Sequence, residues 1–453
     1  MCIFSFKMFD RMNRVIIVFL TIIYIPLCLA LGSRISGHTL DVSLNGYTDS
    51  AERVTFTWEN LCSGDFQREC ENWIDSNIKP RGIMVRCYNT LRYNLFNVAS
   101  NPIADNGDVL ENSYLLEKCC IGINYDYNIS DNKRKMDAYV LELSELQQKL
   151  LQHGKILFVY IAPSKADWDD ESIPPKYINM REDDSVRMYD YFKKSISATD
   201  IVVMDCDELY SSLEYPAFYS TGIHWSRTFE QQASARIIEE LSELTGNKYR
   251  KILLGDVMES TEPFWRDSDV FDNLNLWNRR NEIYYEYAEI RDKNEFDKLR
   301  ILLYGDSFGK GLVKDVLDRY PFEDIFYINY DNYIQTRYAE TTMLNHDWNN
   351  LNFAYYLDRS DVVAIEMTKP CIGEYNCGFV KALNTALDSY VEGNTFQRHL
   401  TELDPSDETV LWNTTDVLGI YEKEDGFVWA QKDSQIILDA ECIKNGGGLK
   451  LII

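Results

Sequence analysis

The chain has 453 residues, of which 45% are hydrophobic and 26% are charged, the composition of a globular protein with a buried core. This length exceeds one small domain and suits one large α/β domain with an additional module. The formal net charge is -26. A surface of this sign repels phosphate backbones, so the composition argues against a nucleic-acid partner.

The first 32 residues contain a candidate membrane segment. Three basic residues precede an uncharged apolar run at residues 15–32, which is about the length that crosses a bilayer. The positive charges predict a cytoplasmic N-terminus and an exported body. Ala30 and Gly32 also have the spacing of a signal-peptidase site. Two alternatives follow: a single-pass anchor in the cell membrane, or a cleaved signal peptide and a secreted body.

The eleven cysteines form no CxxC pair and no metal-like spacing, so no metal site is predicted. Cys62 with Cys70, and Cys371 with Cys377, are close enough in sequence to form local disulfides in an oxidising compartment. Reduced, buried thiols are the alternative.

The body of the chain alternates helical and strand-like segments. Apolar residues at helical spacing predict a helix at residues 136–152. Continuous apolar runs predict strands that are buried on both faces, at residues 155–163, 200–205, 300–307, 324–329 and 361–367. The alternation predicts a doubly wound, mostly parallel α/β sheet, whose working residues lie at the carboxyl ends of the strands.

Composition shifts suggest four regions. Residues 1–33 form the signal segment, and residues 34–54 are polar and turn-rich, as in a short stalk. Residues 55–375 carry the α/β pattern. From residue 376 to residue 453, short β-like pieces separated by Gly, Asn and Asp predict a small β-rich C-terminal region.

The strongest local signal is Leu302–Gly309, an apolar strand that runs into Gly-Asp-Ser and then into a helix. This context places Ser307 at the end of a strand and at a helix N-terminus, where backbone N–H groups can stabilise an oxyanion. The position is that of a nucleophile. A simple turn with a helix N-cap is the alternative.

Position in the predicted fold selects a base for this serine from the five histidines. Four of them lie in the stalk, at a helix end, in a polar loop or beyond the sheet: His38, His153, His346 and His399. His224 remains, in a loop of small residues that leads directly into an amphipathic helix. A structural histidine is the alternative.

Three motifs occur in a specific order: Pro163–Lys165, then Tyr219–Ser226 (YSTGIHWS), then Gly305–Phe308 (GDSF). This order resembles the SGNH hydrolase-like domain of the alginate O-acetylation proteins and their DHHW relatives, over roughly residues 57 to 370. The resemblance implies an SGNH hydrolase-like fold and acyl transfer onto a bacterial cell-surface polysaccharide, beside a multi-pass membrane acyltransferase. It implies no metal, nucleotide or other cofactor.

One position departs from this family, which normally has an aspartate two residues before the histidine. Here that residue is Gly222. Neutralising a triad aspartate can lower a rate by about 10⁴. Asp205, or its neighbour Asp207, is the candidate substitute acid by position, with a backbone carbonyl as the alternative. If the backbone tolerates a side chain, Gly222→Asp should restore a triad.

Further site residues are suggested by position alone. The backbone of Ser307 and the side chains of Asn329 and Asn332 are candidate oxyanion donors, although a loop asparagine is often a turn former. Trp225 and Arg337 are candidate substrate-binding residues.

The expected reaction is attack of Ser307 on an acetyl donor, with His224 as base, followed by transfer of the acetyl group to a sugar hydroxyl. Two alternatives stay open. The chain could be a carbohydrate acetylesterase, with water as the acceptor, or a catalytically silent polysaccharide-binding or scaffold protein of an acetylation complex.

Overall fold

The computed structural model of the chain describes most of the sequence between residues 129 and 392, and parts of both ends. The described residues are 24, 28, 32, 35, 42–46, 56–77, 81–96, 98, 129–168, 187–278, 282–290, 292, 294, 296–319, 324–330, 333–335, 340–342, 348, 351–372, 378–392, 417–424 and 427–436. The predicted membrane segment falls outside this set, apart from three positions. No helix within the set is long and apolar enough to cross a membrane.

The chain divides into two compact units. The first comprises Met1–Lys118 together with Ser268–Glu282, and the second comprises Cys119–Asp267 and Ile283–Ile453. A short segment from the middle of the chain thus belongs with the N-terminal residues, which no pattern in the sequence predicts. The four regions predicted from composition stay a prediction.

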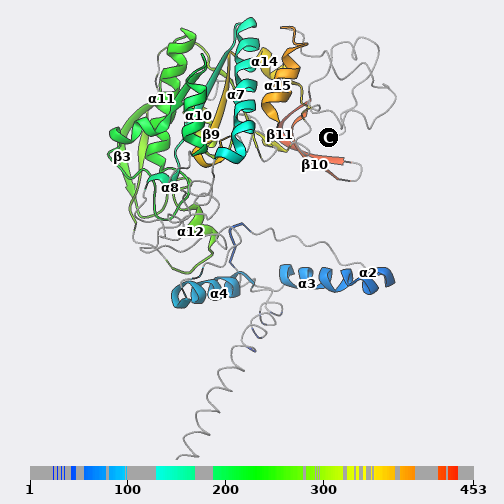
Figure 1. The fold of residues 1–453 in the computed structure, drawn as a ribbon. Helices are drawn as coiled ribbons and strands as arrows, with labels where there is room; N and C mark the ends of the chain where they lie inside the picture. Colours follow the sequence, from blue (N-terminus) through cyan, green and yellow to red (C-terminus); the bar gives the residue numbers. More distant parts are fainter. Residues whose placement is uncertain are drawn as a thin grey trace, which may run out of the picture. The chain divides into compact units, whose positions relative to one another are not determined.

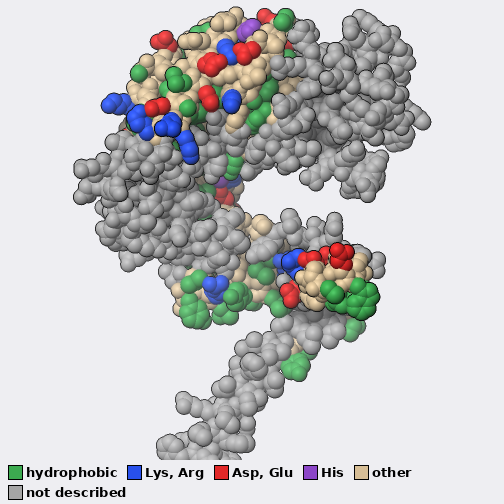
Figure 2. Space-filling model, turned by 45° about the vertical axis from the view of Figure 1, so that its right-hand side comes forward, with side chains coloured by type: hydrophobic (Ala, Val, Ile, Leu, Met, Phe, Trp, Pro, Cys, Tyr) green, Lys and Arg blue, Asp and Glu red, His purple; other side chains and the backbone are tan. Residues whose placement is uncertain are grey.

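The described part of the first unit is helical. Its helices are α2 (Trp58–Ser63), α3 (Asp65–Asn77), α4 (Arg81–Phe96) and α12 (Asp269–Asn273). One side of α4 bonds to the chain that follows α12, where Asn89 Nδ2 donates to Leu274 O at 2.9 Å. In Figure 2, hydrophobic side chains gather over the surface of these helices. Four of those on α4 follow helical spacing: Met84, Tyr88, Leu91 and Leu95.

The predicted disulfide between Cys62 and Cys70 is not formed, and both thiols are free. Gly64 ends α2 in the left-handed conformation, with φ at 85°, so α3 starts in a new direction between the two cysteines. The second predicted disulfide involves Cys377, which lies outside the described residues.

The second unit is built on a seven-stranded sheet with the order β2-β1-β9-β5-β6-β7-β8. The strands are β1 (Ile156–Ala162), β2 (Val202–Asp205), β5 (Arg300–Gly305), β6 (Asp324–Asn329), β7 (Tyr333–Gln335), β8 (Glu340–Thr342) and β9 (Val362–Thr368). Neighbours from β2 to β6 pair in parallel, and β7 and β8 add an antiparallel edge. The prediction of a mostly parallel α/β sheet is confirmed, and each of the five predicted strands is present.

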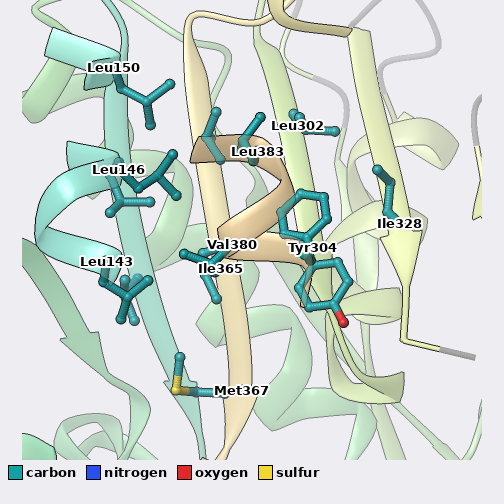
Figure 3. Packing of buried hydrophobic residues seen from close by; sticks show 14 of the residues in the cluster. Leu143, Leu146, Leu150, Leu302, Tyr304, Ile328, Ile365, Met367, Val380 and Leu383 are labelled. Carbon is teal, nitrogen blue, oxygen red and sulfur yellow. The ribbon is translucent and has the colours of Figure 1, made fainter. Parts of the chain in front are cut away.

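Helices cover both faces of this sheet (Figure 1). One face carries α7 (Ile129–Gln152), α10 (Met188–Ile196), α14 (Phe353–Asp358) and α15 (Phe379–Leu387). Figure 3 shows this core, in which leucines of α7 and side chains of α15 pack against β5, β6 and β9. The predicted helix at residues 136–152 is the C-terminal part of α7.

The opposite face carries α11 (Arg227–Thr245) and α13 (Lys310–Arg319). Alternate residues of β1 divide between the two cores, with Leu157 and Val159 on one side and Phe158 and Tyr160 on the other. Because both faces are buried, such a strand is apolar at every position, which explains why continuous runs predicted these strands correctly.

Two smaller sheets complete the second unit. β3 (Leu253–Ser260) and β4 (Tyr284–Ile290) form an antiparallel pair, and β10 (Val417–Glu424) and β11 (Phe427–Ile436) form a hairpin in the predicted C-terminal region.

The carboxyl ends of four parallel strands lead directly into short helices. These are α8 (Lys165–Trp168), η3 (Cys206–Ser212), η4 (Ser307–Gly309) and η6 (Lys369–Cys371), which follow β1, β2, β5 and β9. All three sequence motifs lie in the second unit. The motifs at residues 163–165 and 305–308 lie at this edge of the sheet, where ligands bind in open α/β folds.

Candidate active site

The turn that carries Ser307 is organised by Asp306. This residue caps η4, because its Oδ1 accepts the Phe308 amide at 2.9 Å. Its other oxygen, Oδ2, accepts the backbone N–H of Thr368 at 3.2 Å and the hydroxyl of Thr368 at 2.8 Å. The carboxylate of Asp306 thus ties the serine turn to the end of the neighbouring strand β9.

Glu366 lies directly beneath the same turn. Its Oε2 accepts the Asp306 amide at 2.8 Å, and a Cβ atom on Gly305 would lie 2.5 Å from that oxygen. Burial, followed by the nearby Asp306 carboxylate, raises the pKa of Glu366 well above its usual range. Burial thus favours the neutral form of Glu366, which supports the turn as a hydrogen-bonding group.

Most backbone amides of this turn already have acceptors. The amides of Asp306 and Phe308 donate to carboxylates, and the Gly309 amide donates to Asp306 O at 3.1 Å. In the described part of the chain, the Ser307 amide donates to no acceptor. This N–H is at a helix N-terminus and is the backbone group best placed to bind an oxyanion.

His224 is at hydrogen-bonding distance from this serine. The distance from His224 Nε2 to Ser307 Oγ is 2.8 Å, and the histidine ring packs on Phe308 with 4.7 Å between ring centroids. Both residues are half-buried, and most of their neighbours in the chain are buried. The expected proximity of the two side chains is met, and their catalytic roles stay a prediction.

The loop that carries His224 is held by Lys165 from the first motif. This lysine is 2% exposed, and its Nζ donates to Gly222 O at 2.5 Å and to Ser220 O at 3.4 Å. On the other side of the histidine, Ser226 caps α11 by accepting the Phe229 amide. His224 is thus fixed between a buried lysine and the start of a helix.

Gly222 has no room for a side chain. A Cβ atom there would lie 2.6 Å from the backbone oxygen of Asp267 and 3.1 Å from that of Arg266. The hydroxyl of Thr221 also donates to Asp267 O, at 3.0 Å. The segment that contains Asp267 therefore occupies the space next to the glycine.

Asp267 is itself a buried acid. Its Oδ1 accepts the Arg227 amide at 2.8 Å, and its Oδ2 has no hydrogen-bond partner among the described residues. Burial raises the pKa of this carboxyl to about 8, and the charge of Glu230 adds to the effect, whereas the Arg227 amide opposes it.

A buried charge network connects the serine and histidine segments. Arg227 is 1% exposed and forms ion pairs with three carboxylates: Glu230 at 2.7 Å, Glu286 at 2.8 Å and Asp315 at 2.5 Å. Glu230 also accepts the indole N–H of Trp225 at 3.1 Å.

Arg266 extends this network to Ser307. Its Nη2 pairs with Glu230 at 3.1 Å, and its Nη1 donates to Ser307 O at 2.5 Å. The neighbouring Trp265 has a left-handed backbone with φ at 49°, which costs about 1–2 kcal/mol for a residue with a Cβ.

The remaining predicted site residues are placed differently from the expected roles. Asp205 bonds to Lys193, Tyr189 and the Asp207 amide, and no described contact joins it to His224. Burial works to raise the pKa of Asp205, but the bonds from Lys193 and Tyr189 outweigh burial and lower it. Asp207 pairs with Lys369. Neither contact set supports the role of a substitute acid.

The other candidates fall into two groups. Trp225 is 3% exposed and packs on Phe229 and Phe308, so its ring has no face open to a sugar. Asn329 donates to Tyr327 Oη at 2.6 Å, and that hydroxyl donates to Asp306 O, so Asn329 supports the serine turn from behind. Asn332 and Arg337 lie outside the described residues.

Residues 124–259 match the family described as "SGNH hydrolase-like domain, acetyltransferase AlgX". The matched stretch contains Lys165 and His224 and ends before Ser307. The resemblance inferred from the order of the motifs is confirmed. No curated protein matches the chain.

Several solved structures are similar to the chain at low identity. The O-acetyltransferase domain of Pseudomonas putida AlgJ is 12% identical with a TM-score of 0.39, over 62% of this chain and 99% of that one. Bacillus cereus PatB1 is 10% identical with a TM-score of 0.35, over 53% and 90%. Pseudomonas aeruginosa AlgX is 13% identical with a TM-score of 0.36, over 57% and 60%.

Proposed function

With residues 124–259 assigned to the family of SGNH hydrolase-like acetyltransferase domains, we propose that this chain transfers acetyl groups to a polysaccharide through an acyl-serine on Ser307. The observation that carries the proposal is the distance of 2.8 Å between Ser307 Oγ and His224 Nε2, at the carboxyl edge of the parallel sheet. A nucleophile within hydrogen-bonding reach of a base is the minimal machinery of covalent acyl transfer.

In the first half of the reaction, His224 Nε2 takes the proton of Ser307 as Oγ attacks the acetyl carbonyl of the donor. The tetrahedral oxyanion lies at the Ser307 amide, at the start of η4. Collapse of this species breaks the bond to the leaving group, which takes the proton from His224. The acetyl group stays on Ser307 as an ester.

In the second half, a sugar hydroxyl gives its proton to His224 and attacks the acetyl-serine carbonyl. Collapse then releases the acetylated sugar and returns the proton to Ser307 Oγ. With water in place of the sugar, the same steps give an acetylesterase, so the choice of acceptor separates the two activities.

In this proposal the loop that carries His224 is held in a fixed position. Lys165 and the Ser226 cap hold the histidine loop, which is the orienting task that the aspartate performs in a Ser-His-Asp triad.

The proposed setting is outside the cell. The apolar run at residues 15–32 would anchor the chain in the cell membrane or direct its secretion. A multi-pass membrane acyltransferase would supply the acetyl donor at the same membrane. Both statements rest on the sequence and on the resemblance.

The test uses the full chain and 4-nitrophenyl acetate as a small acetyl donor. We expect mass spectrometry of quenched wild type to find one added acetyl group on the peptide that contains Ser307, and Ser307→Ala to lack it. Ser212→Ala, at an exposed serine of η3, is the matched control and should retain the adduct. Wild type without the adduct, or Ser307→Ala with it at the same site, would contradict the proposal.

A further inference from the structure

Trp265 combines an unfavourable backbone with an exposed side chain. It is one of two non-glycine residues with positive φ in the described part of the chain, and the other is Asn275. Asparagine tolerates this conformation, whereas a bulky residue there is an outlier. The side chain of Trp265 is 48% exposed, so burial of the indole does not account for the strained backbone.

The segment around Trp265 is held on both sides. The Asp267 amide donates to Phe264 O at 3.0 Å, which closes a turn, and Arg266 is fixed by its ion pair with Glu230. Strained residues persist where the surroundings determine their conformation, and they cluster at functional sites. The bonds of Asp267 and Arg266 determine the conformation of Trp265, and Trp265 lies next to a residue that contacts Ser307.

The indole stands close to the nucleophile. The guanidinium of Arg266 lies 5.6 Å from the centroid of the Trp265 ring, and the same group donates to Ser307 O. On the helix that begins after the serine turn, Lys314 Nζ lies 5.2 Å from this ring. A single guanidinium group therefore separates an exposed aromatic surface from the backbone of Ser307.

We propose that Trp265 is the stacking surface for a pyranose ring of the acyl acceptor. The apolar C–H face of a sugar packs on an indole. The N–H groups of Arg266 and Lys314, which lie over the Trp265 ring, suit the sugar's oxygens. The inference rests on the proposed function, because it names the surface that presents an acceptor hydroxyl to the acetyl-serine. Trp265 replaces the buried Trp225 as the aromatic residue for this task.

Binding is tested on the full chain with two defined probes, neutral cellohexaose and acidic hexagalacturonate. We expect calorimetry to show that wild type binds at least one of them and that Trp265→Ala weakens this binding about tenfold, the order of one aromatic contact. Trp265→Phe should stay within about threefold of wild type, because a flat aromatic face remains.

The matched control is Trp277→Ala. Trp277 is 47% exposed and also has an arginine over its ring, Arg86 at 5.4 Å, but it belongs to the first unit. Its replacement should leave binding unchanged. Release of 4-nitrophenol from 4-nitrophenyl acetate without any sugar should be the same in wild type and Trp277→Ala. In Trp265→Ala this release should fall by a smaller factor than sugar binding does, since the step needs no acceptor.

The outcomes separate the two proposals. If neither hexamer binds wild type, or if Trp265→Ala binds as wild type does, the stacking surface is wrong, whatever the state of Ser307. If the hexamers bind as expected but wild type forms no acetyl-serine, the stacking surface stands and the proposed transfer reaction is wrong. A loss of nitrophenol release in Trp265→Ala equal to its loss of sugar binding would indicate a general structural role and overturn the inference.

Discussion

The backbone of Gly222 passes so close to Asp267 that a Cβ atom on the glycine would lie 2.6 Å from the aspartate's carbonyl oxygen. The atom in the way is backbone, so a side-chain rotation cannot relieve the contact. The position two residues before His224 is therefore closed to a side chain by the segment that also carries Trp265 and Arg266.

Gly222→Asp is therefore expected to lower stability without restoring a triad, contrary to the expectation from the sequence. Forcing extra atoms into a filled site typically costs about 1–3 kcal/mol. Urea unfolding of wild type, Gly222→Ala and Gly222→Asp measures the cost, and hydrolysis of 4-nitrophenyl acetate measures the activity. A faster Gly222→Asp with unchanged stability would show that the segment yields to the side chain.

Asp267 predicts a pH-dependent stability. Its pKa is about 8 in the folded chain, whereas an unfolded aspartate has a pKa of about 3.9. Between these values only the folded state holds the proton, so the contribution of this group to stability falls as pH rises towards 8 and is level above it. Below about pH 4 both states are protonated, and the contribution is complete.

Asp267→Asn removes this titration and keeps an oxygen for the Arg227 amide. We expect the free energy of unfolding of the variant to rise relative to wild type as the pH increases from about 4.5 to about 8. Urea unfolding at several pH values measures the difference. Asp256→Asn, at an exposed carboxylate of β3, is the control. A difference for Asp267→Asn that does not change with pH would contradict the assignment.

Lys165 is expected to position the histidine loop. Lys165→Met leaves the carbonyl oxygens of Gly222 and Ser220 without this donor, which should cost about 1–3 kcal/mol of stability. Because a shift of about 1 Å in a catalytic group can lower a rate by about 10², the hydrolysis of 4-nitrophenyl acetate should fall by up to that factor.

A second buried lysine provides the control for this loss. Lys155 is 5% exposed, and its Nζ donates to Ser360 O at 2.9 Å, just before the amino end of β9. Lys155→Met should lower stability by a similar amount and leave the rate of ester hydrolysis unchanged. Equal losses of rate in both variants would mean that Lys165 acts only through global stability.

The sheet and the serine–histidine pair could be predicted because each is marked by a short, continuous pattern in the sequence. Strands buried on two faces are apolar throughout, and the serine turn follows one of them directly. The short edge strands β7 and β8 have no such pattern, since three residues are too few to show the alternation of a strand. Nor did the insertion of residues 268–282 into the first unit, which depends on contacts distant in sequence.

The supporting residues of the site could not be found in the same way. Glu230 lies within a helix and looks like any solvent-facing carboxylate, yet it is 1% exposed and accepts bonds from Trp225, Arg227 and Arg266. Its burial depends on the packing of α11 against α13. Trp265 is distinguished from other exposed aromatic residues by its positive φ angle, which no sequence pattern predicts.

Two glycines near Ser307 lie where buried carboxyl groups leave no room for a side chain. Glu366 fills the space beside Gly305, and Glu230 fills the space where a side chain on Gly311 would stand. Each glutamate and its glycine should therefore change together as sequences diverge, since an alanine at either glycine would collide with the acid. A combined pattern of GDSFGxG, a glutamate near the end of the β9 strand and a glutamate six residues after the histidine gives a sequence fingerprint of this architecture.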